Sequence, residues 1–226
     1  MKKSKVRQFI DTPKVAVDTV LFSMKNHALH VLLIQIDSGE YKNHWALPGA
    51  RVKVNESLDE AARNVLFEKT HITDIYLEQL YSFGDVDRDI RCRMVSVAYF
   101  ALINNPEKYD IVVEPYYKDI RWYPINSLPT EIAFDHKKII SFAHERLKNK
   151  IMYTNIAYSL VPEKFTFTRL QKIYEEILGE TVDKRNFRKR MLTLGLVKKT
   201  RSRIKGKPHR PAWLYTFIKR SPVYIG

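Results

Sequence analysis

The 226-residue sequence has a single cysteine, Cys92, so no internal disulfide is possible, and we expect Cys92 to be a small buried or strand residue. It also lacks any run of about 18 apolar residues and any signal-like apolar segment near the N-terminus. These absences exclude a membrane-spanning helix and give no indication of secretion. We therefore expect a cytoplasmic protein without membrane contacts.

Acidic residues are scarce in the last third of the chain. Residues 151–226 contain 5 Asp and Glu against 17 Lys and Arg, a net charge of +12, whereas residues 1–150 contain 20 against 22, or +2. The asymmetry predicts two domains, 1–150 and 151–226, the second of which binds nucleic acid. A surface for a membrane or for an acidic protein is an alternative explanation of the charge.

Apolar patterns in the first 150 residues predict a sheet between helices. We expect two antiparallel strands joined by a polar loop at 23–29, three later strands, and an amphipathic helix at 135–150. The predicted strands are 15–22, 30–36, 76–83, 95–103 and 121–125, the last ending at a proline. The expected class is α/β with a mixed sheet.

Residues 44–72, HWALPGARVKVNESLDEAARNVLFEKTHI, consist of a strand-like run, a Pro-Gly turn, a loop and a helix. They resemble the Nudix signature G-x5-E-x7-R-E-U-x-E-E-x-G-U, in which U is aliphatic. Glu56 and Glu68 keep their places. Five signature positions differ: Ala50 and His71 replace glycines, Asn64 the arginine, and Val65 and Lys69 two glutamates. The resemblance implies a Nudix α/β/α sandwich.

The substitutions in this helix predict that catalysis has been lost. Positions 65, 68 and 69 share one helix face, where Mg²⁺ would need carboxylate ligands. Val65 and Lys69 supply none, so we expect no catalytic residues, no metal site and no cofactor. Glu68 is either an ordinary ion-pair partner or a remnant ligand contact. Glu56 is expected to pair with the helix start or with Arg51.

A capping box is predicted at the start of the same helix. Ser57 and Glu60 have the S-x-x-E spacing in which the two residues satisfy each other's backbone amides. Glu60 is therefore assigned to structure and not to chemistry.

A charged loop, FGDVDRDIRCR, separates the third and fourth predicted strands. With the strand that follows it resembles the stretch FG-x-x-DRDPR-x-R-x-VSVAYFAL of Nudix-related transcriptional regulators, with Ile90 in place of proline. That resemblance implies a domain that senses ADP-ribose or a related sugar or nucleotide. The expected ligand-binding residues are Arg51, Glu56, Glu68, Asp87, Arg88, Asp89, Arg91 and Arg93. A solvated loop held by its own Asp-Arg pairs is the alternative.

The basic third has the plan of a winged helix-turn-helix, after a segment at 152–162 that is either a linker or a short helix. Thr168 is predicted to cap a helix that stops at Gly179, and Asp183 to cap a second helix with a core stripe at Phe187, Met191 and Leu194. A strand at 197–199, a basic loop at 201–210 and a strand at 212–217 follow. DKRNFRKR and HRPAWLY resemble the same regulator family, so the resemblance runs from about residue 10 to 220.

Exposed cations of this region are the expected DNA contacts. Lys184, Arg185, Asn186 and Arg188 are predicted to read base edges, because Arg suits guanine and Asn suits adenine. The other expected contacts, mainly with phosphates, are Lys189, Arg201, Arg203, Lys205, Lys207, His209 and Arg210.

The hypothesis that follows is a homodimeric transcriptional regulator that binds a double-stranded operator and senses a small molecule. The effector class stays open between a pentose, a sugar phosphate and a nucleotide sugar such as ADP-ribose. A Nudix pyrophosphohydrolase acting on ADP-ribose is the enzymatic alternative. A general RNA- or DNA-binding protein without sequence preference is a third hypothesis.

Overall fold

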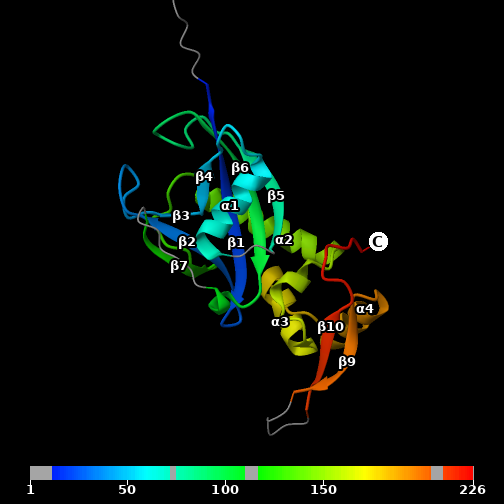
Figure 1. Ribbon diagram of the computed structural model, residues 1–226. Coiled ribbons are helices and arrows are strands. Elements are labelled where there is room, and N and C mark those ends of the chain that lie inside the picture. Colours follow the sequence, from blue (N-terminus) through cyan, green and yellow to red (C-terminus); the bar gives the residue numbers. More distant parts are fainter. Residues whose placement is uncertain (1–11, 72–74, 110–116, 205–210, 226) are drawn as a thin grey trace, which may run out of the picture.

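The computed structural model describes residues 12–71, 75–109, 117–204 and 211–225 (Figure 1). It contains a seven-stranded sheet, a smaller three-stranded sheet and four α-helices within these ranges. No described helix has the length and apolar character needed to cross a membrane.

The first part of the chain runs through elements that all belong to the large sheet or cover it. They are β1 Lys14–Lys25, β2 Ala28–Ile36, β3 Trp45–Ala46, β4 Gly49–Arg51, α1 Leu58–Thr70, β5 Tyr76–Phe83, β6 Met94–Ile103, η1 Pro106–Lys108, β7 Tyr117–Pro124 and α2 His136–Tyr153. The remaining elements are η2 Ile156–Leu160, β8 Phe165–Thr166, α3 Phe167–Leu178, α4 Lys184–Thr193, β9 Val197–Arg203 and β10 Trp213–Phe217.

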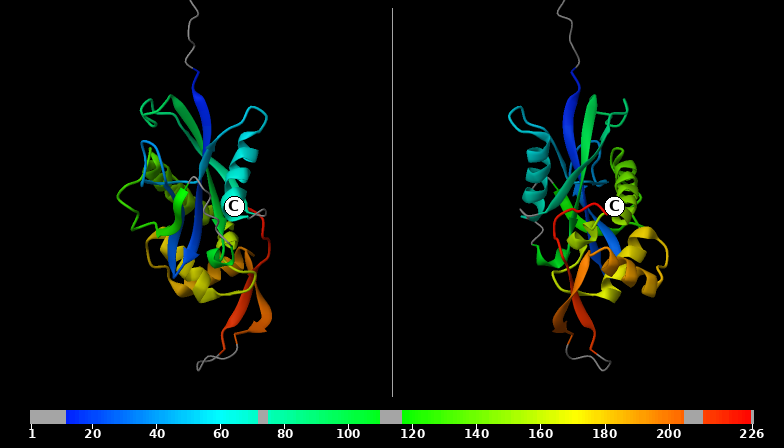
Figure 2. Two further views of the ribbon diagram at one scale, coloured as in Figure 1. Left: turned by 60° about the vertical axis from the view of Figure 1, so that its left-hand side comes forward. Right: turned by 90° about the vertical axis from the view of Figure 1, so that its right-hand side faces the viewer.

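The large sheet is mixed, as predicted. Its order is β3-β2-β1-β6-β5, with β4 also paired to β1 and β7 to β2; β1 runs parallel to β6 and antiparallel to β2. Alternate residues of β1 face opposite sides. Val17 packs against Val65 of α1, whereas Phe22 belongs to the apolar cluster that contains Ile139 of α2. The helices therefore cover opposite faces of the sheet, which confirms the α/β/α arrangement (Figure 2).

β1 and β2 are longer than predicted, so the prediction of a loop at 23–29 is wrong. The pairing continues to Lys25 and Ala28, and only Asn26 and His27 form the turn. Both have positive φ, 49° and 67°, as a two-residue hairpin turn that follows the strand twist requires. The hairpin projects toward the second domain (Figure 1).

The second domain is a winged helix with the predicted order of elements. Its sheet has the order β8-β10-β9, and α3 and α4 pack on one another and on this sheet. The loop predicted between its last two strands begins later than expected, since β9 continues to Arg203. Arg201 and Arg203 are therefore strand residues, not loop residues.

Two helix details in this domain differ from the sequence-based expectation. The N-cap of α3 is Thr166, whose hydroxyl accepts from the amide of Arg169, and not Thr168. Thr166 also pairs with Leu214, so the helix begins as soon as β8 ends. In α4 the capping Asp183 and the buried Phe187 and Met191 are as predicted, but Leu194 is exposed because it lies past the last turn.

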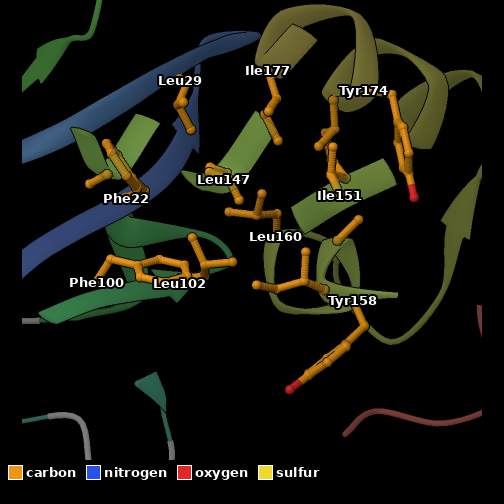
Figure 3. Packing of buried hydrophobic residues seen from close by; sticks show 14 of the residues in the cluster. Phe22, Leu29, Phe100, Leu102, Leu147, Ile151, Tyr158, Leu160, Tyr174 and Ile177 are labelled. Atoms are coloured by element: carbon orange, nitrogen blue, oxygen red, sulfur yellow. The ribbon is translucent and has the colours of Figure 1, made fainter. Parts of the chain in front are cut away.

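One apolar cluster extends from the α2 side of the large sheet into the winged helix (Figure 3). Leu29 of the β1–β2 hairpin, Leu147 of α2 and Ile177 of α3 are all fully buried in it. The backbone amide of Leu29 also donates to Glu176 Oε1 of α3, at 3.0 Å. The two domains therefore share a core and are not merely tethered.

The junction between the domains is helical. α2 passes through residue 150 and ends at Tyr153, and η2 follows, so the segment predicted as a linker or short helix contains a short 3₁₀ helix. After β10 the chain returns to this junction, where Asn155 donates to the carbonyls of Lys219 and Ser221. The predicted division after residue 150 stays a prediction.

Candidate functional site

The first domain contains a pocket of about 250 Å³ beside β1 and β4. Of the predicted ligand-binding residues, Arg51, Arg88, Asp89 and Arg91 line it. The other predicted residues, Glu56, Glu68, Asp87 and Arg93, are not among its lining. Residues that the sequence analysis did not select complete the wall, notably Asp18, Gly49, Phe134 and His136.

A buried charge network forms the floor of this pocket. Asp18 of β1 accepts hydrogen bonds from Ser96 Oγ at 2.5 Å and from Arg88 Nη2 at 3.2 Å, and His136 Nε2 lies 3.3 Å from it. The amide of Leu47 donates to His136 Nδ1 at 2.9 Å. Because Nδ1 accepts this bond, Nε2 carries the hydrogen that faces Asp18.

Arg88 connects this network to the start of α2. Its Nε and Nη2 donate to the two carboxylate oxygens of Asp135, at 3.1 and 2.8 Å, a bidentate arrangement. The side chain of Arg88 is only 3% exposed, so its charge is compensated almost wholly by Asp18 and Asp135. Desolvation lowers the pKa of Arg88, but the two carboxylates outweigh it and raise the pKa.

Burial alone would raise the pKa of Asp18, but His136, Ser96 and Arg88 together lower it to about 2 from 3.8. A carboxyl group with a depressed pKa in the folded state contributes stability above its unfolded pKa, and this is lost as pH falls through the folded value. We expect Asp18→Asn to lower the free energy of unfolding by about 2 kcal/mol near pH 7. Urea unfolding across pH should show the difference from wild type vanishing between about pH 4 and pH 2.

The exposed Asp85 is a matched control, because its carboxylate pairs with Lys138 at the surface. Asp85→Asn should leave the midpoint of urea unfolding close to that of wild type, because exposed ion pairs contribute little to stability. An Asp18→Asn protein as stable as wild type at pH 7 would contradict the assigned network.

The charged loop 84–93 contains an internal Asp-Arg pair and also borders the pocket. Arg91 is paired within the loop with Asp89, through Nε and Nη2 at 2.9 and 2.8 Å, yet its side chain is 46% exposed and lines the pocket. Arg93 instead donates to the carbonyls of Gly84, Asp85 and Met94 and so holds the loop together. Asp87 is exposed.

Phe134 lines the pocket beside Arg91, and Tyr41 lines a neighbouring hollow that shares Arg91 with it. The rings of Tyr41 and Phe134 lie 4.3 Å apart between centroids, and the guanidinium of Arg91 lies 5.0 Å from the Phe134 ring and 5.7 Å from the Tyr41 ring. Phe134 has φ of 57°, which is uncommon for a bulky residue. No hydrophobic periodicity in the sequence indicates that Phe134 lines a pocket. Asp18 could have been selected from the sequence, because it is an acidic residue inside the apolar run VAVDTVLF.

The N-terminus of α1, the helix of the Nudix-like segment, has the predicted structure. Ser57 Oγ accepts from the amide of Glu60, and Glu60 Oε2 accepts from the amide of Ser57, which confirms the capping box. Glu56 accepts from the amide of Lys53 and from Asn64, not from Arg51. Its pairing with Arg51 was therefore wrong.

The rest of this helix holds few possible metal ligands. Val65 is buried against the sheet, and Glu68 is exposed. Among the described residues, no three His, Cys, Asp or Glu side chains are grouped as a metal site would need.

The second domain presents a basic helix to solvent. Lys184, Arg185, Asn186, Arg188 and Lys189 of α4 are all exposed, while Asp183 caps the helix through the amide of Asn186. Arg188 also donates to the hydroxyl of Tyr215 at 2.5 Å, which ties α4 to β10. Arg201 and Arg203 extend the positive surface along β9. The remaining predicted contacts, Lys205, Lys207, His209 and Arg210, lie outside the described residues.

Comparison with known proteins identifies both parts of the fold. Residues 12–142 match the NUDIX domain, and residues 157–217 match the NrtR DNA-binding winged helix domain. A curated relative, the ADPR responsive transcriptional repressor NtrR of Acinetobacter baylyi, is 41% identical over 210 residues, which are 91% of this chain and 82% of the relative. The chain belongs to the NrtR family.

Two solved structures show the same NrtR domains. NrtR of Shewanella oneidensis complexed with a 27mer DNA has a TM-score of 0.77 at 32% identity and covers 90% of this chain and 93% of its own. The Nudix domain of that protein complexed with ADP ribose has a TM-score of 0.53 at 33% identity, covering 60% of this chain and 89% of its own. The predicted family resemblance and fold class are thereby confirmed.

Proposed function

We propose that this NrtR protein is a transcriptional repressor that binds an operator through its winged helix and responds to ADP-ribose bound in its Nudix domain. The observation that carries the proposal is the 41% identity to an ADP-ribose-responsive repressor across both domains. The structure adds a basic helix free to enter a major groove and a polar pocket in the other domain.

The pocket offers complementary chemistry for ADP-ribose. Arg51 supplies positive charge for the diphosphate, and Arg91, whose Nε and Nη2 are paired with Asp89, has a further N–H group for a phosphate oxygen. The Phe134 ring, backed by Tyr41 of the neighbouring hollow, supplies an aromatic surface for the adenine. Asp18, Arg88 and His136 are fixed by their mutual contacts, so the floor of the pocket is formed before the ligand arrives.

We propose that the protein acts as a homodimer in the cytoplasm, with two winged helices on a pseudo-palindromic operator. Half-sites would then be spaced about 34–36 Å apart or a multiple of that distance. Analytical ultracentrifugation with and without the duplex tests this part, and a monomer bound at a single half-site would contradict it.

Anisotropy titrations with a labelled duplex, selected from a random library, test the function directly. ADP-ribose should change duplex affinity about tenfold or more, which corresponds to about 1.4 kcal/mol of coupling, whereas ribose 5-phosphate with AMP should not. The duplex should be preferred over random DNA by about 10³-fold or more. Equal affinity for all duplexes would favour a general nucleic-acid binder.

Hydrolysis of ADP-ribose is the second candidate, because the chain is also 29% identical over 128 residues to an ADP-ribose pyrophosphatase of Methanocaldococcus jannaschii. Val65 is buried where the Nudix signature has a glutamate, so we propose that this activity is lost. Turnover of ADP-ribose with Mg²⁺ in the usual enzyme range, about 1–10³ s⁻¹, would overturn that part of the proposal.

Removing the Phe134 ring should weaken ADP-ribose binding. Stacking of a base on an aromatic ring contributes about 1–3 kcal/mol, so Phe134→Ala should raise the dissociation constant roughly tenfold or more in calorimetry. Phe142→Ala is the control, because Phe142 is exposed on α2 and does not line the pocket. If both variants bind ADP-ribose as wild type does, the adenine lies elsewhere.

A further inference from the structure

The two strands of the wing bring two cations onto one aromatic ring. Lys199 Nζ and Arg203 Cζ each lie 3.6 Å from the ring centroid of Trp213. Both side chains are therefore in cation–π contact with the same indole.

A bulge in β9 produces this arrangement. Arg203 pairs with Trp213, but Lys199 pairs with Tyr215, so three residues of β9 lie opposite one residue of β10. The hydroxyl of Thr200 secures the bulge by donating to the carbonyl of Leu214 at 3.0 Å and accepting from the amide of Ser202 at 3.2 Å. Bulges commonly redirect side chains in this way.

The two cations have no acidic residue near them in the sequence. Residues 184–226 contain no Asp or Glu, and neither cation forms an ion pair with a residue that the structure describes, so the ring orients Lys199 and Arg203. A cation over a ring keeps its charge, and a stacked guanidinium keeps N–H groups at its edge for an acceptor. Both side chains are exposed, on a wing that projects from the body of the molecule (Figures 1 and 2).

We infer that Trp213 is a positioning residue for DNA binding, which holds Lys199 and Arg203 on neighbouring phosphates of one strand while α4 occupies the groove. The inference rests on the proposed operator binding. Lys199 was not among the residues expected from the sequence to contact DNA. Contacts of this kind add affinity without reading sequence, so they set the register of the wing on the backbone.

The test measures duplex affinity as a function of salt for wild type, Trp213→Ala and Trp213→Phe. Trp213→Ala should weaken binding about tenfold and reduce the slope of log K against log salt by up to about 2, because each lost phosphate contact removes about 0.9. Trp213→Phe keeps a flat ring and should restore most of both. ADP-ribose affinity and the preference for the operator should not change.

A second comparison separates positioning from direct contact. In a Lys199→Gln/Arg203→Gln background, Trp213→Ala should cause no further loss of affinity, and a further tenfold loss would overturn the inference because the indole would then touch DNA itself. An unaltered salt slope in Trp213→Ala would also overturn it. If the wild-type protein binds no duplex at all, the result contradicts the proposed function and not only this inference.

Thr200→Val keeps the indole and removes only the bulge hydrogen bonds. It replaces Trp213→Ala in the test if Trp213→Ala unfolds below the assay temperature. It should shift affinity and slope in the same direction by a smaller amount. If a folded Thr200→Val protein has the wild-type slope of log K against log salt, the bulge does not position the two cations.

Discussion

Replacing Arg88 with methionine should lower the free energy of unfolding by about 3–5 kcal/mol. The change removes the only guanidinium that contacts Asp18 and Asp135 among the described residues and leaves two carboxylates close together in a buried site. Removing one partner of a buried ion pair has a cost of this size because the remaining charge is desolvated and unpaired. Urea unfolding followed by circular dichroism measures the loss.

Arg121→Met is the matched control, because Arg121 pairs with Asp119 at the surface and its side chain is 63% exposed. Exposed pairs contribute about 0–1 kcal/mol, so this variant should stay near wild type. Adding Asp135→Asn to Arg88→Met should recover part of the loss, since one unpaired carboxylate then remains. If Arg88→Met unfolds at the wild-type midpoint, the network does not stabilise the fold.

Reversing two charges on α4 should abolish most operator binding. Arg185→Glu with Lys189→Glu changes the net charge by −4 at an exposed helix face. Base-edge contacts contribute about 1–3 kcal/mol each, and repulsion from phosphates adds to their loss. We expect the dissociation constant for the operator to rise by about 100-fold or more at about 0.15 M salt.

A protein with Arg63→Glu and Lys137→Glu carries the same change in net charge on the first domain, where both residues are exposed. Its operator affinity should fall much less, through long-range electrostatics alone. Equal losses in the two proteins would mean that net charge, not the face of α4, governs binding. Calorimetry with ADP-ribose should find both proteins near wild type.

The features predicted correctly from sequence depend on local spacing. The capping box of α1 and the cap of α4 are formed by residues three positions apart, and their backbone partners are fixed once a helix forms. The N-cap of α3 was misassigned because Thr168 has the capping-box spacing with Gln171, whereas Thr166 does not. The pairing of β8 with β10, a contact distant in sequence, decided between them.

The candidate pocket was predicted only in part, because its floor joins distant segments. Asp18, Arg88 and His136 come from a strand, a loop and a helix start, and no periodic pattern relates them. Arg88 and Arg91 were selected from the sequence because charged residues are concentrated in their loop. Glu56 was misjudged because its partner, Asn64, lies two helical turns away.

The β1–β2 hairpin gives the molecule a stiff internal connection. β1 carries Asp18 at the pocket and ends at the turn that leads to Leu29, where the hairpin meets α3. The distance along the strand from Asp18 to the turn is roughly 25 Å, at about 3.3 Å per residue. Because β1 is hydrogen-bonded to β2 and β6 along this path, it resists bending. A small tilt of β1 at the pocket would therefore displace the turn beside α3 sideways, without any segment having to unfold.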